Sequence, residues 1–63
     1  MSKKIKDVIL LLQMNGWHWD RTRGDHRIFK KQGARRPIPI PGKDSDDMPT
    51  GEYHSILREA GLK

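Results

Sequence analysis

One histidine in this chain lies among basic residues, and that combination can support acid–base chemistry. His26 follows a turn-forming Gly24-Asp25 pair, and arginines stand at positions 23 and 27. Imidazole titrates near neutral pH, so it can take or give a proton. Guanidinium groups beside it can hold a phosphate and stabilise the negative charge of a transition state. These residue types favour proton transfer on a phosphate-containing substrate.

RNA suits a single histidine because its 2′-hydroxyl group supplies the nucleophile. The protein then needs only to move protons and to stabilise charge at phosphorus. We therefore expect His26 to be catalytic and four nearby cations to position phosphates: Arg21, Arg23, Arg27 and Lys30. Asp25 is expected to hold the imidazolium form of His26. A lone histidine in a strand is often structural, so a non-catalytic RNA-binding module remains the alternative.

Other kinds of catalysis have little support in the sequence. There is no cysteine, the serines lie in no nucleophile signature, and no glycine-rich phosphate loop is present. A metal site built from His18, Asp20 and His26 across neighbouring strands is conceivable, but it lacks a recognised ligand spacing. We expect a reaction that needs neither a metal nor a cofactor.

The charge of the chain is unevenly distributed. The formal net charge is +5; residues 1–43 hold eleven Lys/Arg and three Asp/Glu, a net +8, and residues 44–63 hold two and five, a net −3. A basic body favours a polyanionic ligand, most simply nucleic acid. A solvated basic surface is the alternative.

Length and composition favour one small domain, residues 1–63, in the cytoplasm. A chain of 63 residues with 33% hydrophobic residues can build only one modest core. The absence of cysteine fits a reducing compartment. No secretory signal is visible, and the apolar run from Val8 to Leu12 is too short to span a membrane.

Helical periodicity is present at both ends of the chain. A helix is predicted from about Lys3 to Met14, with Ser2 as its cap and a stop at Asn15-Gly16. Its buried stripe is Ile5, Val8, Ile9 and Leu12. A second helix is predicted to start at a Thr50 cap, with Glu52 in its first turn, and to end at Gly61 with Leu62 packing back. Its stripe is Tyr53, Ile56, Leu57 and Ala60.

Three strands are predicted between the helices. Residues 17–21 alternate apolar and polar, which predicts that Trp17 and Trp19 both face the core, with base stacking as the alternative role. After a tight turn at residues 23–25, residues 26–31 form a strand with Phe29 facing the core. Residues 35–41 form an outer strand, because prolines at 37, 39 and 41 would blunt its free edge, and Ile38 and Ile40 face the core. Residues 42–49 are expected to form a solvated acidic loop.

The predicted fold is α+β with the order α-β-β-β-α. Two amphipathic helices need an apolar surface, and a three-stranded antiparallel meander offers one. Both helices should therefore lie on the same face of the sheet, in a two-layer arrangement. The other face stays open for a ligand, with the strand of His26 in the middle.

The sequence resembles the HicA toxins of bacterial and archaeal toxin–antitoxin pairs. The likeness runs from Asn15-Gly16-Trp17, through the segment from Arg21 to Phe29, to Gly51 and the closing segment from Ser55 to Leu62. The closing Ser-Ile-Leu and Ala-Gly-Leu groups are the more specific half of the match.

The resemblance implies a double-stranded-RNA-binding-domain-like fold and an mRNA interferase that works without the ribosome. It implies that His26 is the catalytic histidine and that Gly24 belongs to the RNA-binding residues. The expected partners are mRNA and a cognate HicB-like antitoxin that covers the active site. DNA would be contacted only indirectly, through the antitoxin complex.

The chain departs from the family pattern at two positions. Asp25 stands where the family commonly has serine, which brings a negative charge close to the scissile phosphate. Glu52 stands where a threonine often follows the family glycine. The first departure leaves open a weakened or more selective nuclease.

Overall fold

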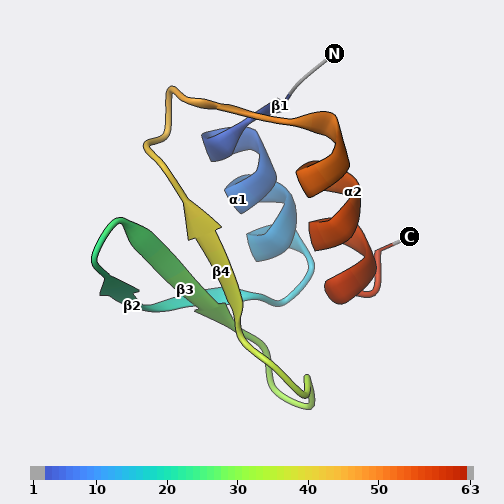
Figure 1. Cartoon of the computed structure of the whole chain (residues 1–63). Coiled ribbons are helices and arrows are strands. Elements are labelled where there is room, and N and C mark those ends of the chain that lie inside the picture. The colour runs from blue at the N-terminus through green and yellow to red at the C-terminus, as the bar shows by residue number, and fades with distance from the viewer. Residues whose placement is uncertain (1–2, 63) are drawn as a thin grey trace.

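The expected two-layer α+β arrangement is confirmed, with one small addition. The computed structural model describes residues 3–62. Both helices lie on the same side of the three-stranded sheet (Figure 1). The elements are β1 (Lys3–Lys4), α1 (Ile5–Met14), β2 (His18–Arg23), β3 (His26–Lys30), β4 (Ile38–Pro41), β5 (Asp47–Met48) and α2 (Thr50–Glu59).

The main sheet is antiparallel with the strand order β2-β3-β4, so the strand of His26 is central as predicted. β4 is an edge strand, which agrees with its prolines. It begins at Ile38 and not at Arg35, because residues 35–37 bend away from the sheet. The basic pair Arg35-Arg36 therefore belongs to the loop that joins β3 to β4.

The core lies between the helices and the inner face of the sheet. Phe29, Ile38 and Ile40 are fully buried, as predicted. The core comprises Ile5, Val8, Ile9, Leu12, Trp17, Phe29, Ile38, Ile40, Met48, Ile56 and Ala60. Tyr53 and Leu62 pack against it from the second helix and its end.

Trp19 was predicted to join Trp17 in the core, and this prediction is wrong. Trp17 is buried before β2 begins, whereas Trp19 is 58% exposed. All six residues of β2 are exposed, because it is the edge strand and α1 packs near β4, at the opposite edge of the sheet. The alternation of apolar and polar residues shows on which face of the sheet a side chain lies, but it does not show how far the helices extend over that face.

A β-bulge interrupts the pairing of β2 with β3. Trp19 pairs with Phe29, but the next pair is Arg21 with Ile28, so Asp20 is an extra residue. An extra residue shifts the alternation of side chains by one. Arg21 consequently lies on the outer face of the sheet, where simple alternation would have placed it beside the tryptophans.

A two-stranded sheet ties the N-terminal part of the chain to the acidic segment. Lys3 pairs with Met48 and Lys4 with Asp47. The first helix therefore starts at Ile5 and not at Lys3, with Lys4 as its cap residue; Ser2 lies outside the described residues. Residues 42–49 are thus not a simple solvated loop, since Met48 is fully buried. Two-residue strands are too short to leave a periodic signal.

Both helices end in the same way, as the glycines predicted. Gly16 and Gly61 have positive φ, and the residues after them, Trp17 and Leu62, donate backbone hydrogen bonds to Leu12 and Leu57. The start of α2 differs from the prediction. Its cap residue is Pro49 and no side-chain cap bond is made, so Thr50 is the first helical residue; Glu52 does lie in the first turn.

Candidate active site

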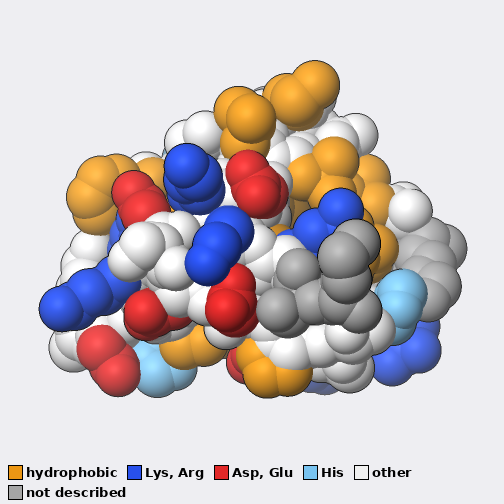
Figure 2. All heavy atoms as spheres, turned by 90° about the horizontal axis from the view of Figure 1, so that it is seen from above, with side chains coloured by type: hydrophobic (Ala, Val, Ile, Leu, Met, Phe, Trp, Pro, Cys, Tyr) orange, Lys and Arg blue, Asp and Glu red, His pale blue; other side chains and the backbone are white. Residues whose placement is uncertain are grey.

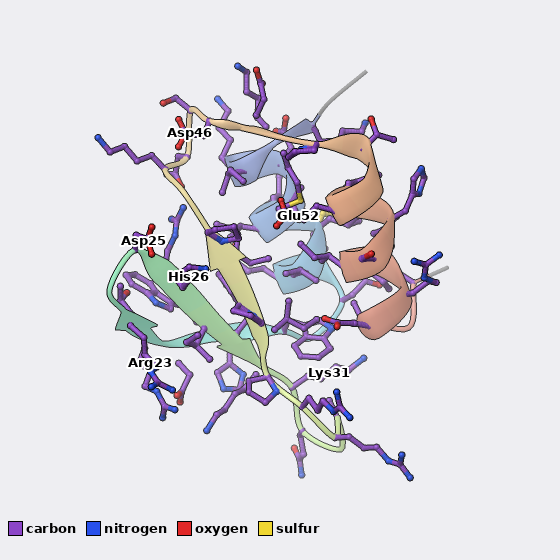
Figure 3. All side chains as sticks on the ribbon, viewed as in Figure 1. Arg23, Asp25, His26, Lys31, Asp46 and Glu52 are labelled. Atoms are coloured by element: carbon purple, nitrogen blue, oxygen red, sulfur yellow. The ribbon has the colours of Figure 1, made fainter. Side chains whose placement is uncertain are left out.

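His26 stands at the start of β3, directly after a tight turn made by Gly24 and Asp25. Gly24 has φ +59°, which an L-residue adopts only at a cost of about 1–2 kcal/mol. The turn puts the Asp25 carboxylate 2.7 Å from Nδ1 of His26 (Figure 3). A carboxylate oxygen accepts hydrogen bonds, so Nδ1 of His26 is the protonated ring nitrogen and donates a hydrogen bond to Asp25. Nε2 is then the nitrogen that remains for a substrate.

The outer face of the sheet, away from the helices, carries three of the other expected site residues, Arg21, Arg23 and Lys30. Directly opposed residues in paired strands share a face. Arg23 is opposite His26, Arg21 is opposite Ile28, and His18 is opposite Lys30. Ile28 is only 8% exposed but does not belong to the core, so it forms an apolar floor on this outer face.

A hollow next to His26 contains a residue that the sequence did not single out. It is lined by Arg23, His26, Ile28, Arg36, Pro37 and Pro39. Two guanidinium groups and one imidazole thus meet over an apolar floor. Arg36 reaches this hollow from the loop after β3. The basic pair Arg35-Arg36, just before the proline-rich strand, is the sequence feature that could have pointed to this residue.

Arg21 and Lys30 share an acidic neighbour. Asp20, the bulge residue, lies 3.5 Å from Arg21 and 3.7 Å from Lys30. Both distances are long and all three side chains are partly exposed, so these pairs are weak. Arg21 and Lys30 remain accessible to a phosphate on the face of His26.

Arg27 is not brought together with His26. It is opposite Ile40, on the inner side of the sheet, and its side chain is only 22% exposed. Its guanidinium is 2.7 Å from Asp44 and also donates to the Gly42 carbonyl. The structure thus places Arg27 in a contact between the sheet and the acidic segment.

The other polar candidates lie elsewhere. His18 is at the far end of the hairpin from His26, and His54 is on α2 with its ring 5.6 Å from that of Tyr53. Within residues 3–62 no three His, Cys, Asp or Glu side chains gather closely enough to hold a metal ion. None of the helices in this part of the chain has the length and hydrophobicity of a membrane span.

The family model for the HicA toxin of bacterial toxin–antitoxin systems matches residues 5–62. The chain belongs to the HicA toxin family. Comparison with individually characterised proteins gives no match. As a HicA family member, the protein is the toxin of a toxin–antitoxin pair, and an antitoxin is its expected partner.

Proposed function

We propose that this HicA toxin is a metal-independent endoribonuclease that cleaves mRNA without the ribosome, with His26 as its catalytic residue. The observation that carries the proposal is the Asp25–His26 pair on an open, cationic face of the sheet. Asp25 fixes the imidazole through Nδ1, so Nε2 points away from this carboxylate. The side chain of His26 is 46% exposed, so a substrate can reach it.

The reaction follows from the chemistry of RNA. Nε2 of neutral His26 takes the proton of a 2′-hydroxyl group, and O2′ attacks the adjacent phosphorus. The bond from phosphorus to O5′ breaks, and O5′ takes a proton from water or from the imidazolium. The products are a 2′,3′-cyclic phosphate and a 5′-hydroxyl end. Asp25 stabilises the imidazolium, as a carboxylate does in a catalytic triad.

The surrounding cations stabilise the negative charge that develops on the phosphate oxygens. Arg23 and Arg36 line the same hollow as His26 and are suited to this role. Arg21 and Lys30 lie further along the same face and are suited to holding neighbouring phosphates. Gly24 contributes by allowing the turn that presents Asp25 and His26.

The partner expected for this surface is a HicB-like antitoxin that covers the face of His26. Such a complex would block the substrate and stabilise the toxin by mass action. DNA would be contacted only through the antitoxin. A growth assay with and without a co-expressed HicB-like antitoxin would test this part of the proposal.

Cleavage of a purified single-stranded RNA in EDTA tests the catalytic part. We expect wild-type protein to cleave it, and His26→Ala to lose about 10²- to 10⁴-fold in rate while still binding RNA. His18→Ala is the matched control, because His18 is also an exposed histidine of this hairpin. Unchanged cleavage by His26→Ala would refute the proposal. Binding without cleavage in every form would instead identify a non-catalytic RNA-binding module.

A further inference from the structure

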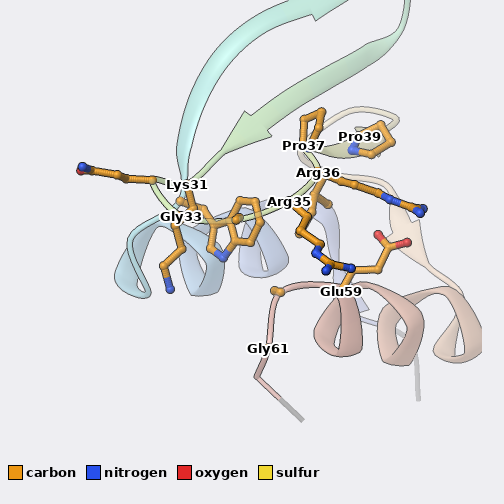
Figure 4. Close-up of a pocket in the computed structure, with 13 residues that line it drawn as sticks. Lys31, Gly33, Arg35, Arg36, Pro37, Pro39, Glu59 and Gly61 are labelled. Atoms are coloured by element: carbon orange, nitrogen blue, oxygen red, sulfur yellow. The ribbon is translucent and has the colours of Figure 1, made fainter.

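A second hollow adjoins the one at His26. It lies between the loop after β3 and the C-terminal end of α2, and has a volume of about 810 Å³ (Figure 4). Arg36, Pro37 and Pro39 line both hollows. A ligand strand that leaves His26 over these residues therefore enters the second hollow directly.

The second hollow has a cationic rim and an apolar floor. Lys31, Arg35 and Arg36 supply the charge, and Glu59 is the one carboxylate among the described residues that line it. Figure 4 shows Arg35 and Glu59 extending into the space between the loop and α2. Trp17, Ile38 and Ala60 form the apolar part of the lining. Phosphates suit such a rim, and the face of a base suits such a floor.

The cations of this rim have no acidic partner. Within residues 3–62, no ion pair is formed by Lys31, Arg35 or Arg36, whereas Lys4, Arg21, Arg27 and Lys30 each have one. The stem of Lys31 lies over Gly16, so its position is partly fixed by packing. Charge that the protein itself leaves uncompensated is available to a polyanion.

One residue of the lining has a buried polar group that pairs with nothing described. Nε1 of Trp17 is buried, and it has no hydrogen-bond partner within the described part of the chain. A buried donor without a partner costs about 1–3 kcal/mol. Because Trp17 also lines the hollow, the signal of its indole N–H can report on a ligand that binds there.

We propose that this hollow is a second nucleotide subsite, in which single-stranded RNA continues from the phosphate at His26. The subsite rests on the proposed ribonuclease function and extends it. Arg36 serves both hollows, and Arg35 serves only the second. Binding in the second hollow holds the substrate, so Arg35 acts on substrate affinity and Arg36 on affinity and rate.

The test uses single-stranded RNA with a 2′-deoxy sugar at the cleavage position, so that binding is measured without catalysis. For Arg35→Ala we expect roughly ten-fold weaker binding to a long oligonucleotide. The slope of log affinity against log salt should fall by about 0.7, the value for one phosphate contact with a single strand. Glu59→Gln should tighten binding, because it removes the one acidic group of the lining. Lys43→Ala is the charge-matched control, since Lys43 also forms no ion pair with a described residue and lines neither of the two hollows.

The two tryptophans locate the ligand directly. The chain has only two indole N–H signals, and Trp19→Phe assigns them. On addition of the same RNA we expect the Trp17 signal to shift and the Trp19 signal to stay, since Trp19 is outside both hollows. The Trp17 shift should be lost in the double variant Arg35→Ala/Arg36→Ala.

The outcomes separate this inference from the proposed function. If His26→Ala abolishes cleavage but Arg35→Ala changes neither affinity, salt slope nor KM, the subsite is refuted and the ribonuclease stands. If Arg35→Ala weakens only the complex with the antitoxin, the hollow is a protein-docking site and the subsite is again refuted. Loss of RNA affinity with an unchanged kcat supports the subsite. Melting temperatures of the variants exclude unfolding as the cause.

Discussion

The two sides of this molecule differ in how many of their positive side chains form ion pairs. On the side of β1 and the segment from Gly42 to Met48, acidic and basic side chains are intermixed (Figure 2). Lys4 pairs with Asp47 at 2.9 Å and Arg27 pairs with Asp44 at 2.7 Å. On the outer face of the sheet and the loop after β3, Arg23, Arg35 and Arg36 form no ion pair with any described residue.

The difference shows that the acidic segment does not neutralise the protein as a whole. Its carboxylates compensate the cations nearest to them, which hold the segment against α1 and the sheet. Arg23 and Arg36, which line the hollow of His26, form no ion pair with a described residue. Positive charge without an acidic partner among the described residues is therefore found where the substrate is proposed to bind.

Removing a free cation next to His26 should have the largest effect. We expect Arg36→Ala to lower kcat/KM for RNA cleavage by about 10²-fold, because a donor to the charged phosphate is lost. Its free energy of unfolding should change by less than about 0.5 kcal/mol, since the loop side chain is exposed. Single-turnover cleavage and thermal melting measure the two quantities. Equal activity of Arg36→Ala and Lys43→Ala would show that a free cation next to His26 is no more important for cleavage than one elsewhere on the surface.

Changing the acid that pairs with His26 should have a smaller effect on the same activity. Asp25→Asn keeps the size of the side chain but removes the charge that stabilises the imidazolium of His26. We expect a rate loss of about ten-fold and a changed pH–rate profile. Asp25→Ser, which introduces the serine common in the family, serves as the second variant. A pH–rate profile identical to that of wild type in Asp25→Asn would show that Asp25 does not act through His26.

On the paired side, a substitution should affect stability and not cleavage. Arg27→Ala should destabilise the fold by about 1 kcal/mol, because it removes a half-buried ion pair with Asp44 and the packing of the arginine stem. This corresponds to a decrease of roughly 4–8 °C in melting temperature. RNA cleavage at a temperature where both proteins are folded should be unchanged. A large loss of cleavage with normal stability would show that Arg27 contacts the substrate.

The smallest effect is expected at the exposed pair of Lys4 and Asp47. A hydrogen bond and the charge of Asp47 raise the pKa of Lys4 above its usual 10.5. A raised lysine pKa means that its stabilising effect is complete below 10.5 and is lost as the pH rises through the pKa of the folded state. Lys4→Met should therefore lower the melting temperature slightly at neutral pH and not at strongly alkaline pH. An equal decrease at both pH values would show that the contribution of Lys4 is not electrostatic.

The features that could be predicted from the sequence are those set by local patterns along the chain. Helical stripes such as Ile5 to Leu12 and the glycine stops were read correctly because periodicity and positive φ are local properties. The central position of β3 followed from the prolines of β4. The same alternation that puts Phe29 in the core also puts Arg27 on that side, which separates it from His26.

The features that the sequence did not reveal depend on distant parts of the chain. The exposure of Trp19 depends on how far the helices cover the sheet. The face of the sheet on which Arg21 lies depends on the extra residue Asp20, and no local sequence pattern indicates this bulge. Arg36 reaches the hollow of His26 only because its loop folds back over β3 and β4, and Met48 is buried only because β5 meets β1.

The pairing of β1 with β5 has a consequence for folding kinetics. Lys3 and Met48 are neighbours in the sheet but lie at opposite ends of a very long closed loop. Closing such a loop costs chain entropy before any contact is gained, so this pairing should form after the β2–β3 hairpin. The hairpin that carries His26 then folds first, through contacts between residues close in sequence, and the acidic segment pairs with β1 afterwards.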